Sequence, residues 1–133
     1  DCMVKGNQSL LYGALSNLVR NAEAYSRGSE IGIRCADVTD RLYTFEFWDN
    51  GVGVADEYLP HLFERFFRID KGRSRKNGGT GLGLPIVKNT IVAHGGTIKV
   101  SNRPGGGLMF TFTLQRWRDD MTACEEDSSD DYE

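Results

Sequence analysis

The chain has few cysteines, prolines and histidines, and it has no long run of apolar residues. Its three cysteines, Cys2, Cys35 and Cys124, are odd in number and lack a paired spacing, which argues against both a disulfide framework and a zinc site. No apolar stretch reaches the length of a membrane span, and no signal peptide opens the sequence. These absences favour one folded domain in a reducing compartment, and 133 residues are enough for a self-supporting core.

Positive charge is missing from residues 119–133, which hold eight of the nineteen acidic residues and none of the sixteen Lys and Arg. The remainder of the chain is therefore basic, although the formal net charge of the whole is −3. Residues 119–133 have almost nothing to bury, so we expect a disordered acidic tail after a domain that spans residues 1–118. A docking or regulatory role is the alternative to a solvated terminus.

Helices are predicted in three places. Apolar residues recur at helical spacing between residues 7 and 26, with Asn7 as a candidate N-cap and Gly28 as a natural stop. A second amphipathic helix is expected at residues 84–94, where Pro85 is tolerable only in the first turn. A short helical stretch, interrupted by a proline, is expected at residues 56–67.

Strands are predicted in two pairs. Alternating segments at residues 31–35 and 42–48 indicate antiparallel strands around a polar turn at 37–40, and residues 97–101 and 109–114 indicate a later hairpin. The order of helix, strands, helix and strands favours an α+β fold. We expect a two-layer α/β sandwich in preference to a doubly wound sheet.

Two amide side chains are expected to share one face of the first helix. Asn17 and Asn21 lie four residues apart, and Tyr25 extends the row by another turn. An Asn oxygen is a suitable ligand for Mg²⁺, which also takes oxygens from phosphates. Taken alone, the pair is better explained as two solvated asparagines on an exposed helix face.

The segment DNGVG at residues 49–53 directly follows a predicted strand. Asp49 could accept a hydrogen bond from an exocyclic amine, while Gly51 and Gly53 let the backbone approach a flat ring. The alternative is a hairpin turn, which the Asn50-Gly51 pair also favours. That alternative is weakened because the next segment does not resemble the second strand of a tight hairpin.

The segment GTGLGLP at residues 79–85 opens a predicted helix. The first backbone N–H groups of a helix form an anion site that glycine leaves uncrowded, and the alternative is a flexible linker before the helix. Residues 70–80 are basic and without periodicity, so we expect a mobile loop there. Its Lys and Arg could screen phosphate charge or could simply be solvated.

With FERF at residues 63–66, these blocks occur in one order that resembles the catalytic, ATP-binding domain of sensor histidine kinases, a branch of the gyrase-type ATPases. The resemblance covers about residues 4–117 and includes the stretches at 93–98 and 105–107. The blocks are specific as a set, whereas each alone is a common pattern. The resemblance implies a mixed, mostly antiparallel sheet that is covered on one face by helices, with ATP bound between the helices and a mobile lid.

The resemblance also implies roles for individual residues. Asn21 is similar to the magnesium-binding asparagine, with Asn17 as a candidate second ligand. Asp49 is similar to the carboxylate that reads adenine, and Tyr25 to the residue that covers the adenine face. The other positions implied in ATP binding are Gly51, Gly53, Phe66, Gly79, Thr80, Gly81, Leu82, Gly83 and Leu84. Phe63 and Phe66 would anchor the lid, and Arg65 and Arg68 would join Asn17 and Asn21 in catalysis by reaching phosphate or a partner helix.

Two positions depart from the family pattern. Ala24 stands where the family often has Lys or Arg, so one phosphate contact is missing or is supplied by Arg20 or the lid. Leu108 follows the last glycine block where Thr is common. Asn17 stands where the hydrolysing branch has Glu, and an amide cannot act as a general base.

The resemblance therefore implies transfer of the γ-phosphoryl group of Mg–ATP to a histidine on another domain. The alternatives are a nucleotide-binding sensor module without phosphotransfer and a serine/threonine kinase of the anti-sigma type. We interpret His61 and His94 as structural, and so expect the chain to be a fragment that lacks the phosphoacceptor. The expected partners are the histidine-containing dimerisation domain of the same protein and a response regulator, not a nucleic acid. We expect the fragment to be a monomer and the full protein to be a homodimer anchored in the bacterial inner membrane, with this domain cytoplasmic.

Overall fold

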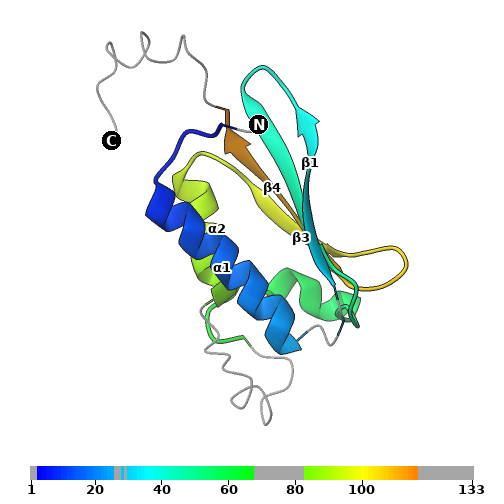
Figure 1. Cartoon of the computed structure of the whole chain (residues 1–133). Helices are drawn as coiled ribbons and strands as arrows, with labels where there is room; N and C mark the ends of the chain where they lie inside the picture. The colour runs from blue at the N-terminus through cyan, green and yellow to red at the C-terminus, as the bar shows by residue number, and fades with distance from the viewer. Residues whose placement is uncertain (1–2, 26–27, 29, 68–82, 117–133) are drawn as a thin grey trace, which may run out of the picture.

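The computed structural model describes residues 3–25, 28, 30–67 and 83–116. In chain order its elements are α1 (Gln8–Tyr25), β1 (Ile31–Val38), β2 (Leu42–Asp49), the 3-10 helix η1 (Asp56–His61), α2 (Gly83–Ala93), β3 (Ile98–Asn102) and β4 (Leu108–Gln115) (Figure 1). The predicted loop at 70–80 and the predicted tail at 119–133 lie outside the described residues, so the domain boundary at residue 118 stays a prediction.

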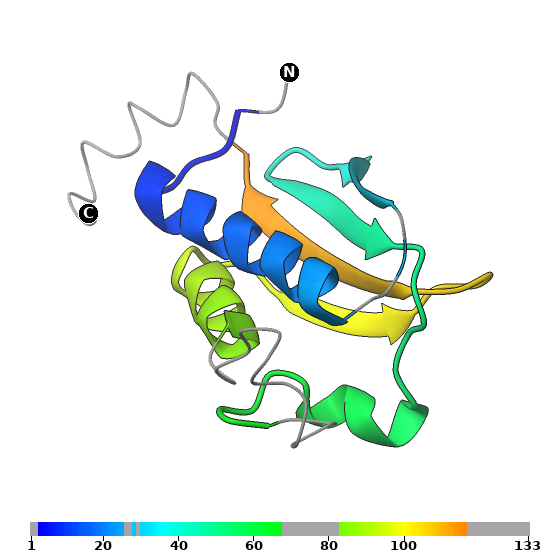
Figure 2. The same cartoon turned by 60° about the horizontal axis from the view of Figure 1, so that its bottom comes forward.

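The described strands form one sheet in the order β1-β2-β4-β3, and each neighbouring pair is antiparallel. A single antiparallel bridge joins Val4 to Arg116 beyond the named strands. The helices α1 and α2 lie side by side on one face of this sheet (Figure 1 and Figure 2). The α+β two-layer sandwich is therefore confirmed, although the parallel pairing implied by a mixed sheet is not found among the described strands.

The core lies between the sheet and the two long helices. Alternate residues along β4 are buried, as expected for a strand with one face on the core. The helices contribute buried residues at intervals of three and four, which is the spacing of one helical face. The buried core residues from these elements are Ala14, Leu18, Ala22, Leu84, Val87, Ile91, Leu108, Phe110, Phe112 and Leu114.

Polar contacts fix one end of each long helix. The Asn7 side-chain oxygen accepts a hydrogen bond from the Leu10 N–H at 2.9 Å, which confirms Asn7 as an N-cap. The helix α2 ends in a Schellman arrangement, in which the Gly96 N–H donates to the Ile91 carbonyl at 2.9 Å. His94 links the start of α1 to the end of α2. It donates a hydrogen bond through Nδ1 to the Thr90 carbonyl at 2.8 Å and accepts one at Nε2 from the Asn7 N–H at 3.0 Å. The structural interpretation of His94 is thus confirmed.

Two predicted boundaries were wrong. The strand β1 continues to Val38, because a bulge between Cys35 and Asp37 absorbs one residue and shifts the side-chain alternation that marked its predicted end. The helical stretch predicted over residues 56–67 is only the short η1, followed by turns. Pro60 explains this, since it has no N–H to continue a regular helix. In the part of the chain that the structure describes, no helix combines the length and apolar character needed to cross a membrane.

Candidate functional site

Asp49, the last residue of β2, carries a buried carboxyl group and is only 3% exposed. Its Oδ1 accepts hydrogen bonds from the backbone N–H of Gly51 at 2.9 Å and of Leu108 at 3.3 Å. No described residue donates to Oδ2. Because a buried carboxylate oxygen without a donor is unfavourable, the site is suited to a ligand that brings an N–H group.

The backbone of Gly107 packs directly against the carbonyl and the carboxyl group of Asp49. Gly107 has φ +97°, and a Cβ atom there would overlap the Asp49 carbonyl and lie 2.8 Å from Oδ1. Only glycine fits this position without a backbone shift. Arg103 adds support from the same turn, with its guanidinium 4.0 Å above the Trp48 ring and a hydrogen bond of 3.4 Å to the Asp49 carbonyl.

The segment that follows Asp49 is held by two asparagines. Asn50 pairs with Glu30, accepting its N–H at 2.9 Å and donating its own backbone N–H to the Glu30 carbonyl at 3.2 Å. Asn102, at the end of β3, accepts the Val54 N–H at 2.9 Å and donates to the Val54 carbonyl. Since β2 pairs with β1 and β4 and not with the segment that follows Asp49, the hairpin-turn alternative for residues 49–53 does not apply. Sequence reasoning missed Asn102 because its partner lies 48 residues away.

The amide row on α1 lies beside the start of α2. Asn17 and Asn21 are both half-buried. A Cβ atom added to Gly83, the first residue of α2, would lie 3.4 Å from the Asn17 side-chain oxygen. The structure therefore brings the first and fourth sequence blocks together. Tyr25 is the last residue of α1, and its side chain lies outside the described part.

The two phenylalanines of the third block differ in environment. The Phe63 ring packs edge-on against Phe110 of the core, with centroids 6.1 Å apart, and the Lys88 ammonium lies 5.7 Å from its centroid. Phe66 is 63% exposed and has φ +65°, a left-handed conformation that is uncommon for a bulky residue. Phe63 therefore anchors the segment, whereas Phe66 is presented to solvent with the Arg65 guanidinium 5.6 Å from its ring centroid.

Several predicted site residues cannot be placed in this geometry. Arg68, Gly79, Thr80, Gly81 and Leu82 lie outside the described residues. Leu84 is described, and its side chain is buried in the core, so any part in binding falls to its backbone N–H. The described residues contain no group of three His, Cys, Asp or Glu side chains suited to a metal. A metal that takes most of its oxygens from water and phosphate, as Mg²⁺ does, is compatible with this donor set.

His61 is an exposed histidine near the third block. Its Nδ1 lies 2.7 Å from Glu64 Oε2, and its ring stacks on Phe67 with centroids 5.4 Å apart. These contacts support the structural interpretation of His61.

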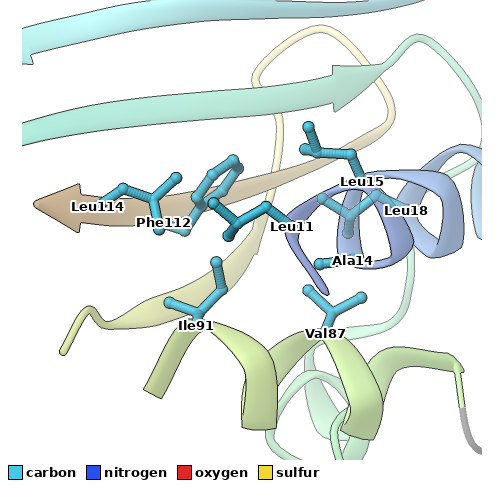
Figure 3. Close-up of a pocket in the computed structure, with 8 residues that line it drawn as sticks. All are labelled: Leu11, Ala14, Leu15, Leu18, Val87, Ile91, Phe112 and Leu114. Carbon is cyan, nitrogen blue, oxygen red and sulfur yellow. The ribbon is translucent and has the colours of Figure 1, made fainter. Parts of the chain in front are cut away.

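A small cavity of about 20 Å³ lies between α1, α2 and β4 (Figure 3). Aliphatic and aromatic side chains line it, among them Leu15, Leu18, Val87, Ile91 and Phe112. A cavity of this size and chemistry neither holds a nucleotide nor offers partners to a water molecule. It is a packing feature of the core and is not part of the candidate site.

Known proteins match this chain in sequence and in fold. The profile of the family described as "Histidine kinase-, DNA gyrase B-, and HSP90-like ATPase" matches residues 6–118. The sensor-like histidine kinase SenX3 of Mycobacterium tuberculosis is 49% identical over 116 residues, which are 84% of this chain and 27% of that protein. The chain thus spans about a quarter of the length of the curated relative.

Solved structures are similar as well. The mycobacterial sensor histidine kinase MprB matches with a TM-score of 0.71 and 28% identity, over 85% of this chain and 76% of that one. Full-length ShkA in complex with AMPPNP matches with a TM-score of 0.72 and 25% identity, over 88% of this chain and 24% of that one.

Proposed function

Because the chain belongs to the family of histidine kinase-, DNA gyrase B- and HSP90-like ATPases, as a domain homologous to those of sensor histidine kinases, we propose that it binds Mg–ATP and transfers the γ-phosphoryl group to a histidine of a separate domain. The observation that carries the proposal is the buried carboxyl group of Asp49, with Oδ1 engaged and Oδ2 without a described donor. An adenine amine is a donor of the kind that Oδ2 lacks.

Base recognition in this proposal is centred on Asp49. Its Oδ2 accepts a hydrogen bond from the 6-amino group of adenine, while Gly51 and Gly53 allow the ring to approach the backbone closely. Tyr25 covers the face of the base. The structure of full-length ShkA, a similar protein, in complex with AMPPNP supports a nucleotide site in this fold.

The phosphates lie, in the same proposal, between α1 and the start of α2. The N–H groups around Gly81, Gly83 and Leu84 bind phosphate oxygens, and Asn21, with Asn17 beside it, supplies amide oxygens to Mg²⁺. When bound, Mg²⁺ neutralises phosphate charge and holds the triphosphate in one orientation. The half-buried positions of Asn17 and Asn21, and the closeness of Asn17 to Gly83, support this arrangement.

Phosphoryl transfer then requires positioning rather than a base from this chain. The acceptor histidine nitrogen attacks the γ-phosphorus, an N–P bond forms, and the bond to the β–γ bridging oxygen breaks to release ADP. Arg65 and Arg68 stabilise the charge on the transferring group. Asn17 cannot activate water, which favours transfer over hydrolysis.

The whole protein is proposed to contain a helical dimerisation domain that bears this histidine and to pass the phosphoryl group to a response regulator. Anchoring in the bacterial inner membrane, with this domain cytoplasmic and monomeric on its own, is proposed with it. The presence of further domains is supported by the relative SenX3, a named histidine kinase that is almost four times as long as the matched segment.

Leu108 does not favour the alternative of a silent nucleotide binder. Its side chain is buried in the core, and its backbone N–H donates to Asp49 whatever the side chain is. The departure from Thr at this position therefore leaves the Asp49 contact intact.

The decisive experiment mixes the purified chain with a histidine-bearing dimerisation segment from a similar kinase and γ-labelled ATP. Label that is lost in acid and retained in alkali is expected on the histidine. ATP binding without label would identify the silent binder, and acid-stable label would identify a serine/threonine kinase. Absence of ATP binding would contradict the proposal as a whole.

A further inference from the structure

The backbone of Val54 pairs with a side chain instead of a strand. Asn102 accepts the Val54 N–H at 2.9 Å and donates through Nδ2 to the Val54 carbonyl. The same Nδ2 lies 3.2 Å from Asp56 Oδ1. One amide group thus satisfies both backbone groups of Val54 and also reaches the first residue of η1.

We propose that Asn102 is a positioning residue for base recognition, which acts by fixing the segment 50–54 and through it the carboxyl group of Asp49. This inference rests on the proposed binding of ATP. Asn102 itself does not contact the nucleotide in the proposal. Its effect is on the orientation of the one carboxylate that discriminates the base.

The connection between Asn102 and Asp49 runs through two glycines. Gly53, adjacent to Val54, has φ +71°, and a Cβ atom there would lie 2.6 Å from the Asn102 side-chain oxygen. The glycine at 53 is therefore required in part by the approach of Asn102. Gly51, two residues earlier, donates its N–H to Asp49 Oδ1 at 2.9 Å. Release of Val54 would leave the segment held at Asn50 by its contacts with Glu30, and would loosen the part that carries this donor.

A purely structural role would have a different signature. Asn102 is exposed and contributes nothing to the apolar core, so its removal leaves the packing of the core intact. If its only role were stability, its removal would lower the unfolding temperature and leave discrimination between bases unchanged. If it positions Asp49, the discrimination itself falls.

The test compares ATP with purine riboside 5′-triphosphate, which has hydrogen in place of the 6-amino group. The dissociation constants of both are measured by calorimetry on the full 133-residue chain and on its Asn102→Ala variant. The unchanged chain is expected to prefer ATP by about tenfold or more, as for a hydrogen bond to a charged acceptor. In Asn102→Ala, affinity for ATP is expected to fall toward that for the analogue, while the affinity for the analogue changes little.

Thr113→Val is the matched control. The Thr113 hydroxyl accepts the Thr97 N–H at 2.9 Å in the same hairpin of β3 and β4, far from Val54. This variant loses a comparable hydrogen bond and should keep the full preference for ATP. Asn102→Asp is the second variant, and it replaces Asn102→Ala in the comparison if that protein does not fold. It keeps the side-chain volume but cannot donate to the Val54 carbonyl, and it is also expected to lose discrimination.

The outcomes separate the two proposals. If the unchanged chain binds both triphosphates equally or binds neither, the assignment of Asp49 as the base reader is wrong, and the proposed function loses its carrying observation. If the unchanged chain discriminates and both Asn102 variants discriminate as well as it does, the positioning role of Asn102 is excluded.

Discussion

Gly107, in the turn that joins β3 to β4, is in direct backbone contact with Asp49 at the end of β2. A Cβ atom at Gly107 would overlap the Asp49 carbonyl and would also lie 2.8 Å from its Oδ1. The candidate base reader is thus enclosed by main chain from one side, and any side chain at position 107 must displace it.

We therefore expect Gly107→Ala to lower both stability and ATP affinity. The positive φ and the overlap together should reduce the free energy of unfolding by about 1–3 kcal/mol. Gly105→Ala is the control, because Gly105 also has a positive φ of +91°, but no atom lies within 4 Å of the position that its Cβ would take. Chemical denaturation and nucleotide titration of both variants make the comparison. Equal ATP affinity in the two variants would argue against a role for the Asp49 contact.

Asp49→Asn should weaken ATP binding while leaving the fold intact. The substitution keeps the shape and the acceptor for the N–H groups of Gly51 and Leu108, but it removes the negative charge that an adenine amine would meet. We expect a loss of about 10- to 100-fold in ATP affinity, from the energy of a hydrogen bond to a charged group. Calorimetry gives the loss directly.

Glu46→Gln is the control for that substitution. Glu46 lies on the same strand and pairs with Arg34 at 2.7 Å, away from the candidate site. The Glu46→Gln variant should bind ATP as tightly as the unchanged chain. A comparable loss in both variants would show a general effect of charge on β2 and not base recognition.

Asn21→Ala is expected to abolish the binding of Mg–ATP, because the amide oxygen proposed for the metal is removed. His61→Ala should leave binding intact, since the contacts of His61 are with Glu64 and Phe67. Titrations with and without Mg²⁺ measure both. Unchanged affinity of the Asn21 variant in Mg²⁺ would count decisively against the assignment of the metal ligand.

Ile91→Ala should destabilise the domain by about 2–5 kcal/mol, because it enlarges a cavity in a buried core. Ile91 is 2% exposed and lines the small cavity between the helices and β4. On the same helix Ile86 is 46% exposed, so Ile86→Ala should cost less than about 1 kcal/mol. Equilibrium unfolding in urea distinguishes the two. Similar losses of unfolding free energy for both variants would show that α2 does not pack against the sheet through the face that carries Ile91.

The sequence was most informative where the signal was local. The stripe of apolar residues located α1 to within one residue at each end, and Asn7 was identified as its cap from residue type and position. Asp49 and its glycines could be marked because they directly follow a strand. The bulge in β1 was not predictable, because it interrupts the side-chain alternation in the same way as the end of a strand does.

Contacts between distant segments could not be predicted. The closeness of Asn17 to Gly83 depends on the packing of two helices, and the pairing of Asn102 with Val54 depends on the sheet. The different environments of Phe63 and Phe66 follow from the position of Phe110, which is far along the chain. At Leu108 the sequence suggested a functional change because the residue type departs from the family pattern. The contact with Asp49 is made by the backbone N–H, however, and does not depend on the side chain.

Main-chain donors alone hold Oδ1 of Asp49 in the described structure. Evolutionary drift at position 108 can thus exchange one side chain for another without turning the carboxylate, provided that the apolar volume is kept. Proline is the exception, because it has no N–H to give. A library randomised at this codon should consequently tolerate aliphatic replacements and reject the imino acid.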